Sequence, residues 1–272
     1  MPLRLVMMGT GTFALPTFRA LFGAGQEVGG LVTQPDRVGR GHHHHPHPMK
    51  EYGVVHGVPV FQPEDVNAPE SLDRLREFQA DVFVVAAYGQ ILSAELLAIP
   101  RWGAINLHAS LLPKYRGAAP IQYAVWQGET ETGVTVFRIE PKLDAGPILG
   151  VVRTPIEPHE TSGELEERLA APLTLTVLDQ IQHGTTQPQP QPPGGVTRAR
   201  KLKKAAGLID WSGGAREIDC HIRAMQPWPM PGTLLHLPGK PPLRMLVLRG
   251  AAVDPPAGLG PVPGAVLAAG GR

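Results

Sequence analysis

Apolar residues gather in six short runs along the first part of the chain. Each run is five to seven residues long and is bounded by glycine, proline or polar residues, a pattern typical of β-strands. The sequence therefore predicts strands over residues 3–8, 28–33, 82–86, 103–107, 133–139 and 148–152.

Helical periodicity fills the segments between these runs. Helices are predicted over 13–23, 70–79, 93–98, 119–127 and 161–183, the last of which opens with the capping signature TSGE. Alternation of strands and helices predicts an α/β fold with a mostly parallel sheet. Functional residues of such sheets lie beyond the carboxyl ends of the strands.

The pattern changes after residue 183. Residues 184–197 read GTTQPQPQPPGGVT and have no hydrophobic period, which predicts a semi-extended linker. A helix at 214–225 and three short strand-like pieces, TLLHL, RMLVL and GAVLA, follow and indicate a small β-barrel or a fragment of one. The predicted organisation is a main unit over 1–183, a linker over 184–200 and a second unit over 201–272.

Charge is divided unequally between these units. From residue 198 onward the chain has 11 Lys and Arg against 4 Asp and Glu, whereas the remainder has 14 against 20. A basic module on an acidic body suits a polyanionic partner such as nucleic acid, although a solvated surface rich in Lys and Arg explains the count equally well. The single cysteine excludes an intramolecular disulfide, and no apolar stretch reaches about 18 residues, so we expect a cytoplasmic protein without a membrane partner.

Candidate chemistry is concentrated in AINLHASLLPKYRGAAP, residues 104–120. Asn106 and His108 lie two residues apart near the end of a predicted buried strand, so their side chains share a face. Such a polar pair is either a site or a satisfied element of the core. Asp144, in PKLDAGPIL, is ordinarily a turn former. If the fold brings it near His108, then amide, imidazole and carboxylate form an acyl-transfer site that needs no Ser or Cys nucleophile.

Two other stretches have less specific patterns. GTGTFA, residues 9–14, with Asp36 further on, resembles a dinucleotide fingerprint, but any tight strand-to-helix turn needs such glycines. The polar stretch QPDRVGRGHHHHPHPMK, residues 34–50, has five histidines between 42 and 47. Dense imidazoles could chelate zinc, yet structural sites favour spaced ligands, so we expect adventitious affinity and no required metal. Arg40, between two glycines, could reach a phosphate backbone.

Together these motifs resemble a known family. NLHASLLPKYRGAAPIQ and KLDAGPIL, with GTGTFALP, QPDRVGRG and KLKKAAGLIDW…IRAMQPWP, are similar to the formyltransferases that use 10-formyltetrahydrofolate, over nearly the whole chain. The resemblance implies a Rossmann-like formyltransferase domain, a smaller OB-like C-terminal domain, and a catalytic trio of Asn106, His108 and Asp144. HASLLP followed by RGAAPI is most similar to members that act on methionyl-tRNA.

The resemblance also implies the roles of these residues. The α-amine of methionine on initiator tRNA would attack the formyl carbon, with Asn106 polarising the formyl oxygen and His108 stabilising the oxyanion. Asp144 would orient His108 and draw off the amine proton through water. Tetrahydrofolate-binding residues implied in the same way are Ser110, Leu111, Leu112, Pro113, Ala87, Tyr88, Gly89, Ile91 and Leu92.

For the tRNA, the stretch at 34–50 resembles the family's insertion that contacts the acceptor arm, which implies roles for Arg37 and Arg40. Its histidines stand where most members have lysines, so affinity would depend on pH. Lys201, Lys203 and Lys204 lie where the linker meets the second unit. The family's C-terminal domain continues past the PGAVLA-like strand, so we expect either a barrel that lacks two strands or a tail that folds differently. We expect the protein to act as a monomer.

Other functions remain open at this stage. A formyltransferase acting on a nucleotide or sugar amine, or a hydrolase releasing formate, would share the trio, although the basic second unit and the IDW…PWP stretch favour tRNA. A noncatalytic RNA-binding protein is disfavoured because all three trio residues are present. An NAD dehydrogenase would leave the trio unexplained.

Overall fold

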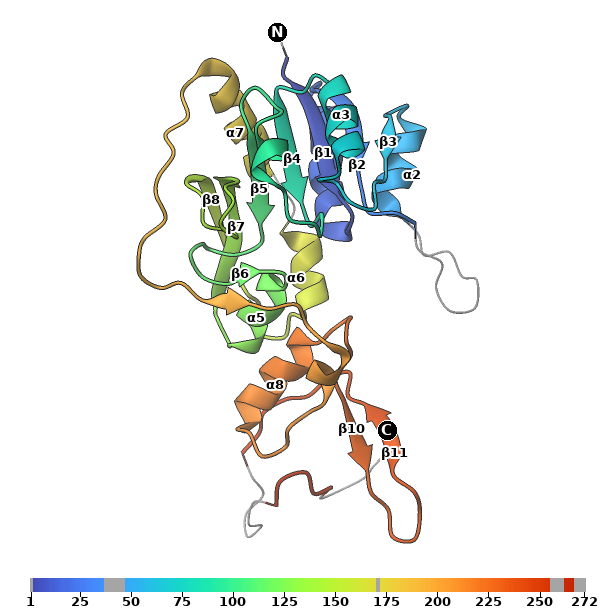
Figure 1. Ribbon diagram of the computed structural model, residues 1–272. Coiled ribbons are helices and arrows are strands. Elements are labelled where there is room, and N and C mark those ends of the chain that lie inside the picture. Colours follow the sequence, from blue (N-terminus) through green and yellow to red (C-terminus); the bar gives the residue numbers. More distant parts are fainter. Residues whose placement is uncertain (1, 37–46, 170–171, 255–261, 267–272) are drawn as a thin grey trace.

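The computed structural model describes residues 2–36, 47–169, 172–254 and 262–266 (Figure 1). Its centre is a seven-stranded sheet in the order β3-β2-β1-β4-β5-β7-β8. The first five strands in this order are parallel, whereas β7 and β8 are antiparallel to their neighbours. The strands are β1 (Arg4–Gly9), β2 (Glu27–Val32), β3 (Val60–Phe61), β4 (Val82–Ala86), β5 (Ala104–His108), β7 (Glu131–Arg138) and β8 (Ile148–Pro155). The predicted α/β fold and all six predicted strands are confirmed.

Helices lie between the strands on both faces of this sheet (Figure 1). A 3-10 turn, η1 (Thr12–Ala14), leads into the first of them. The α-helices of the main unit are α1 (Leu15–Gly23), α2 (Pro48–Val55), α3 (Pro69–Glu77), α4 (Ala94–Leu97), α5 (Pro120–Trp126), α6 (Ser162–Arg168) and α7 (Pro172–His183). Of these, α2 begins inside the polar stretch 34–50, where a ring nitrogen of His47 accepts a hydrogen bond from the backbone N–H of Lys50.

Two hydrophobic cores form because side chains alternate along each strand. In β1, Leu5 and Met7 face a core shared with Phe18 of α1, and this core extends to α5, α6 and α7. The intervening Val6 and Met8 face a second core that includes α3 and α4. Both faces of the parallel strands are therefore covered, which explains why these strands read as nearly continuous apolar runs.

The helix predicted over 161–183 is wrong in one respect, because the structure divides it. α6 ends at Arg168 and α7 begins at Pro172. A proline within a helix lacks the N–H that would bond the preceding turn, and its ring clashes with that turn, so the chain restarts the helix there. The predicted cap is confirmed, since Thr161 and Glu164 form a capping box.

The predicted linker runs beside the sheet in an extended conformation (Figure 1). Its backbone pairs with strands of the main unit at two places. Gln189 forms an antiparallel bridge with Ile148 of β8. Further on, β9 (Arg198–Ala199) pairs in parallel with β6 (Arg116–Gly117). Neither attachment follows from the sequence pattern, because two-residue strands carry no periodicity.

The described part of the second unit contains a piece of the small β-barrel, or fragment of one, that the sequence suggests. It contains η2 (Lys204–Gly207), α8 (Ala215–Ala224) and one antiparallel hairpin of β10 (Gly232–Leu235) and β11 (Leu243–Leu246). The pieces TLLHL and RMLVL are thus confirmed as strands, whereas the described residues of GAVLA, 264–266, form none, and the described part of this unit holds no closed barrel.

Candidate active site

Strand β5 brings Asn106 and His108 to the carboxyl end of the parallel sheet, as predicted. Asn106 is half-buried and His108 is 5% exposed. The intervening Leu107 points to the opposite face and belongs to the first core. Loops that follow β1 and β4 meet at the same edge, where the Thr10 hydroxyl donates to the carbonyl of Tyr88 at 3.3 Å. This edge is where parallel α/β sheets place their ligands.

The His108 ring has one definite hydrogen-bond partner. Its Nε2 lies 2.8 Å from the carbonyl oxygen of Tyr115, which can only accept, so Nε2 carries a proton. Burial lowers the pKa of His108, although the Asp144 carboxylate and the bond to Tyr115 act in the opposite direction. The neutral ring therefore presents the lone pair of Nδ1. A donor role for this nitrogen, as predicted, requires the ring to gain a proton first.

Asp144 lies next to this nitrogen, as the acyl-transfer interpretation required. Its Oδ2 is 3.9 Å from Nδ1 of His108, and its side chain is 11% exposed. The same oxygen accepts the backbone N–H of Gly117 at 2.7 Å. The residue has a φ of +46°, in the left-handed region that aspartate tolerates better than most side chains. Its backbone conformation and one hydrogen bond thus aim the carboxylate toward His108.

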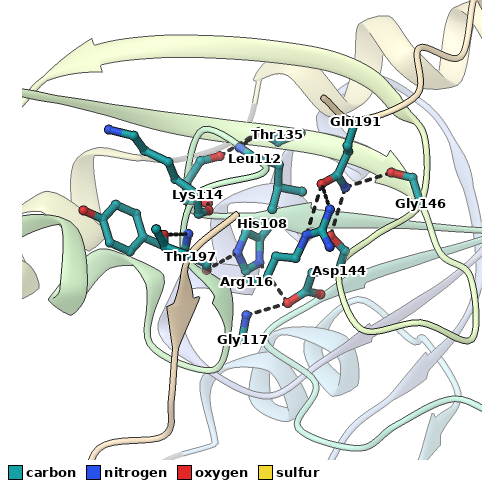
Figure 2. A network of polar contacts seen from close by, with 12 residues as sticks. His108, Leu112, Lys114, Arg116, Gly117, Thr135, Asp144, Gly146, Gln191 and Thr197 are labelled. Atoms are coloured by element: carbon teal, nitrogen blue, oxygen red, sulfur yellow. Dashed lines mark hydrogen bonds and ion pairs between the residues drawn. The ribbon is translucent and has the colours of Figure 1, made fainter. Parts of the chain in front are cut away.

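The segment 115–117 supports both side chains of this pair. Its Tyr115 carbonyl accepts from His108, and its Gly117 N–H donates to Asp144. The segment is in turn held by the linker, because the Tyr115 N–H donates to Thr197 Oγ1 at 2.8 Å. Figure 2 shows these contacts as one continuous polar network. A short stretch of backbone therefore fixes the distance between imidazole and carboxylate.

Sequence reasoning missed several side chains of this network, among them Thr197, Arg116 and Gln191. The Arg116 guanidinium donates through Nε and Nη2 to Oε1 of Gln191, at 3.2 and 2.5 Å (Figure 2). Gln191 belongs to the repetitive stretch QPQPQPP, residues 187–193, which predicts only a linker. Nothing in that stretch distinguishes it from Gln187 or Gln189.

The predicted folate segment 110–113 forms a tight turn over β7. Ser110 is fully buried, and its hydroxyl donates to the Lys114 carbonyl at 2.6 Å. Thr135 of β7 secures the turn, since its hydroxyl donates to the Ser110 carbonyl and accepts the Leu112 N–H. Ser110 and Leu112 therefore shape this turn, whereas Leu111 and Pro113 are half-buried and face outward in part.

The other predicted folate segment, 87–92, follows β4 and divides into two groups. Tyr88 and Leu92 are buried in the second core. The Tyr88 hydroxyl has no hydrogen-bond partner among the described residues, and burial raises its pKa. Ala87 and Gly89 are exposed with positive φ, and Ile91 is 77% exposed. Only this second group is free to contact a ligand.

The predicted polyanion-binding residues are only partly described. Arg37, Arg40 and the histidines at 42–45 lie outside the described residues. Lys201, Lys203 and Lys204 are exposed directly after β9. Asp36, the acid of the weak dinucleotide pattern, pairs with Lys50 and accepts from Gln62 at 3.0 Å.

No group of three or more His, Cys, Asp or Glu side chains in the described part of the chain is placed to hold a metal ion. Among the helices that the structure describes, none has the length and apolar character needed to span a bilayer.

Comparisons with known proteins agree with this geometry. Residues 3–178 match the formyl transferase family and residues 201–271 match the formyl transferase C-terminal domain. A protein of Symbiobacterium thermophilum named methionyl-tRNA formyltransferase is 47% identical over 231 residues, which cover 84% of this chain and 71% of that relative. A protein of the same name from Magnetococcus marinus is 46% identical over 242 residues, covering 88% and 77%.

A solved structure shows the same fold at lower identity. The N-formyltransferase of Helicobacter canadensis, in complex with folinic acid and dTDP-3-aminofucose, aligns with a TM-score of 0.65 and 19% identity over 82% of this chain and 80% of that one. Since the family match spans most of the main unit and the relatives match most of the chain, this chain belongs to the formyl transferase family.

Proposed function

We propose that this protein transfers a formyl group from 10-formyltetrahydrofolate to the α-amine of methionine on initiator tRNA, for translation initiation in the cytoplasm. The observation that carries the proposal is the His108–Asp144 pair at the carboxyl end of β5. Relatives of 47% and 46% identity named methionyl-tRNA formyltransferase support the choice of acceptor. Family membership and the folinic acid of the Helicobacter canadensis complex support a folate-derived donor.

The proposed chemistry begins with attack of the amine nitrogen on the formyl carbon. A new C–N bond forms as the carbonyl electron pair moves to oxygen, and the Asn106 amide donates to that oxygen. Nδ1 of His108, which has the lone pair, takes one proton from the attacking nitrogen. The negative charge of Asp144, 3.9 Å away, stabilises the resulting imidazolium.

The second half of the reaction returns this proton. The oxyanion collapses, the bond between the formyl carbon and N10 of the folate breaks, and Nδ1 of His108 gives its proton to N10. The products are formyl-methionyl-tRNA and tetrahydrofolate. While protonated, the imidazolium also donates toward the oxyanion, which is the role that the family resemblance implies for His108.

We assign the two substrates to different surfaces. The folate would contact Leu111, Pro113 and the exposed group of the 87–92 segment, while the buried Ser110, Tyr88, Leu92 and Leu112 keep both loops in shape. The tRNA would bind Lys201, Lys203 and Lys204 with Arg37 and Arg40. These placements divide the chain into a catalytic unit over 1–183, a linker over 184–200 and a tRNA-binding unit over 201–272. The protein would act as a monomer. Phosphate contacts of this kind make affinity fall steeply with salt.

The test is direct formation of product. Purified protein is incubated with 10-formyltetrahydrofolate and methionyl initiator tRNA, and formyl-methionyl-tRNA is followed on an acid gel. We expect product from the unaltered protein and a loss of about 100- to 1,000-fold in turnover for Asn106→Asp, which keeps the size of the side chain but removes its N–H donors. Formate release without tRNA, or formylation of a nucleotide-linked amino sugar in place of tRNA, would overturn the proposal.

A further inference from the structure

We infer that Gln191, in the linker between the two units, is a positioning residue of the active site, which holds Asp144 and Arg116 in their places beside His108. This inference rests on the proposed function, because it gives Gln191 a part in the same reaction. It assigns to the linker a task beyond connecting the catalytic unit to the second unit.

The Gln191 amide uses its whole hydrogen-bonding capacity on this one site. Its Nε2 donates to the carbonyl oxygens of Asp144 and Gly146, both at 2.9 Å (Figure 2). Its Oε1 accepts from Nε and Nη2 of Arg116. Carbonyl oxygens only accept and a guanidinium only donates, so the amide has a single workable orientation. A half-buried side chain with four matched contacts is not a passive part of a flexible linker.

These contacts join the two segments that carry the catalytic geometry. On one side, Gln191 donates hydrogen bonds to the turn in which Asp144 has its positive φ. Surrounding contacts are needed to maintain such a backbone conformation. On the other side, it accepts hydrogen bonds from Arg116. The neighbours of Arg116 hold the pair, since the Tyr115 carbonyl accepts from His108 and the Gly117 N–H donates to Asp144. Removing the amide would therefore free both ends of the His108–Asp144 pair.

The linker around Gln191 is anchored firmly enough to impose this geometry. Before it, Gln189 exchanges backbone hydrogen bonds with Ile148 at 2.7 and 2.8 Å. After it, the Thr197 carbonyl accepts the Arg116 N–H at 3.0 Å, and β9 pairs with β6. Since backbone hydrogen bonds fix the chain on both sides of residue 191, the position of the Gln191 side chain relative to its partners is fixed as well.

Gln189 offers a matched control for the experiment. It is the same residue type, two positions earlier, but its side chain is exposed and donates only to the carbonyl of Gln187, at 3.3 Å. A glutamate at either position adds the same charge to the same linker. Only at position 191 does the change replace an N–H donor with an acceptor that faces two carbonyl oxygens.

The experiment compares Gln191→Glu, Gln191→Met and Gln189→Glu with the unaltered protein in steady-state formylation of methionyl-tRNA. We expect kcat to fall by roughly 10- to 100-fold in both Gln191 variants, as displacement of catalytic groups by about 1 Å commonly causes. KM for both substrates should stay within about twofold, as should every parameter of Gln189→Glu. Gln191→Met, which is uncharged and of similar length, keeps the test valid if Gln191→Glu does not fold.

A second readout does not depend on turnover. The charged groups that face His108 are Asp144 and Arg116, and a glutamate at 191 adds negative charge beside both. NMR titration of the His108 ring should therefore give a higher pKa in Gln191→Glu and no change in Gln189→Glu. Unchanged kcat together with an unchanged His108 titration overturns the inference, as does a rise in KM for tRNA alone, which would make Gln191 a tRNA contact. If the unaltered protein makes no product, the proposed function fails, and the titration still decides the role of Gln191.

Discussion

Replacing Asp144 by asparagine separates the charge of this residue from its shape. An asparagine oxygen can still accept the Gly117 N–H that Asp144 accepts at 2.7 Å, and the backbone carbonyl still faces Gln191. The change removes the negative charge that lies 3.9 Å from Nδ1 of His108 and replaces one carboxylate oxygen by an NH2 group of the same size. Asp144→Asn therefore tests whether that charge stabilises a protonated His108 during the reaction.

The size of the effect follows from the distance. Two unit charges about 4 Å apart interact by about 4 kcal/mol at the effective dielectric constant of roughly 20 that suits protein sites. Screening by salt is small because the two side chains are only 6% and 11% exposed. Since about 1.4 kcal/mol corresponds to a tenfold change in rate, we expect the formylation rate to fall about 1,000-fold.

The assay is single-turnover formylation of methionyl-tRNA at saturating folate, with folate affinity and thermal unfolding measured on the same sample. Asp179→Asn is the matched control, because Asp179 also pairs with a histidine, at 3.2 Å from His183, but on an exposed helix surface. We expect this control to keep its rate within about twofold, as exposed pairs contribute little. A loss of less than about tenfold in Asp144→Asn, with the fold intact, would refute the electrostatic reasoning.

Three further predictions concern stability. Burial lowers the pKa of His108 below 6.5, so the unfolded chain binds more protons than the folded protein as pH falls below that value. The urea concentration at the midpoint of unfolding should therefore drop between pH 7 and pH 5.5, and it should drop less in His108→Gln. Burial alone would raise the pKa of Glu160, but hydrogen bonds from Arg168 lower it, so its stabilisation is present above pH 4.5 and is lost as pH falls through the lowered value. Glu160→Gln should cost about 1–3 kcal/mol at pH 7 and less at pH 3.5, by chemical denaturation. Gly117→Ala directs a Cβ into the carbonyl oxygen of Ala199 in the linker, at a φ of +124°, whereas Gly184→Ala, at a φ of +66°, meets open space. Only the first change should release the linker to limited proteolysis.

The parallel strands β1, β4 and β5 could be predicted from sequence because burial on both faces leaves continuous apolar runs. The runs at 82–86 and 103–107 coincide with β4 and β5 to within one residue. Elements of two residues, such as β6 and β9, are too short to show a period, and they exist because distant segments pair. The break before α7 was predictable from Pro172, and the continuous helical periodicity on both sides concealed it.

Asn106 and His108 could be predicted as a candidate site because polar residues are conspicuous where a buried strand ends, whereas only the folded chain shows that Asp144 lies beside His108. What the sequence did not predict is how the pair is held. The supports of His108 and Asp144 are backbone groups of Tyr115 and Gly117, which are independent of side-chain type. Gln191 comes from a segment 47 residues beyond Asp144, and only the folded chain brings the two together.

The pairing of β6 with β9 sets an order of events during synthesis of the chain. Tyr115 and its linker partner Thr197 are 82 residues apart. At about 5–20 residues per second, the ribosome needs about 4 to 16 s to make the intervening segment. All strands of the central sheet have been made before then, since β8 ends at Pro155. The core of the enzyme can therefore begin to fold before β9 has been made to pair with β6 at the catalytic edge. A nascent chain can thus bury its apolar side chains before it is competent for catalysis.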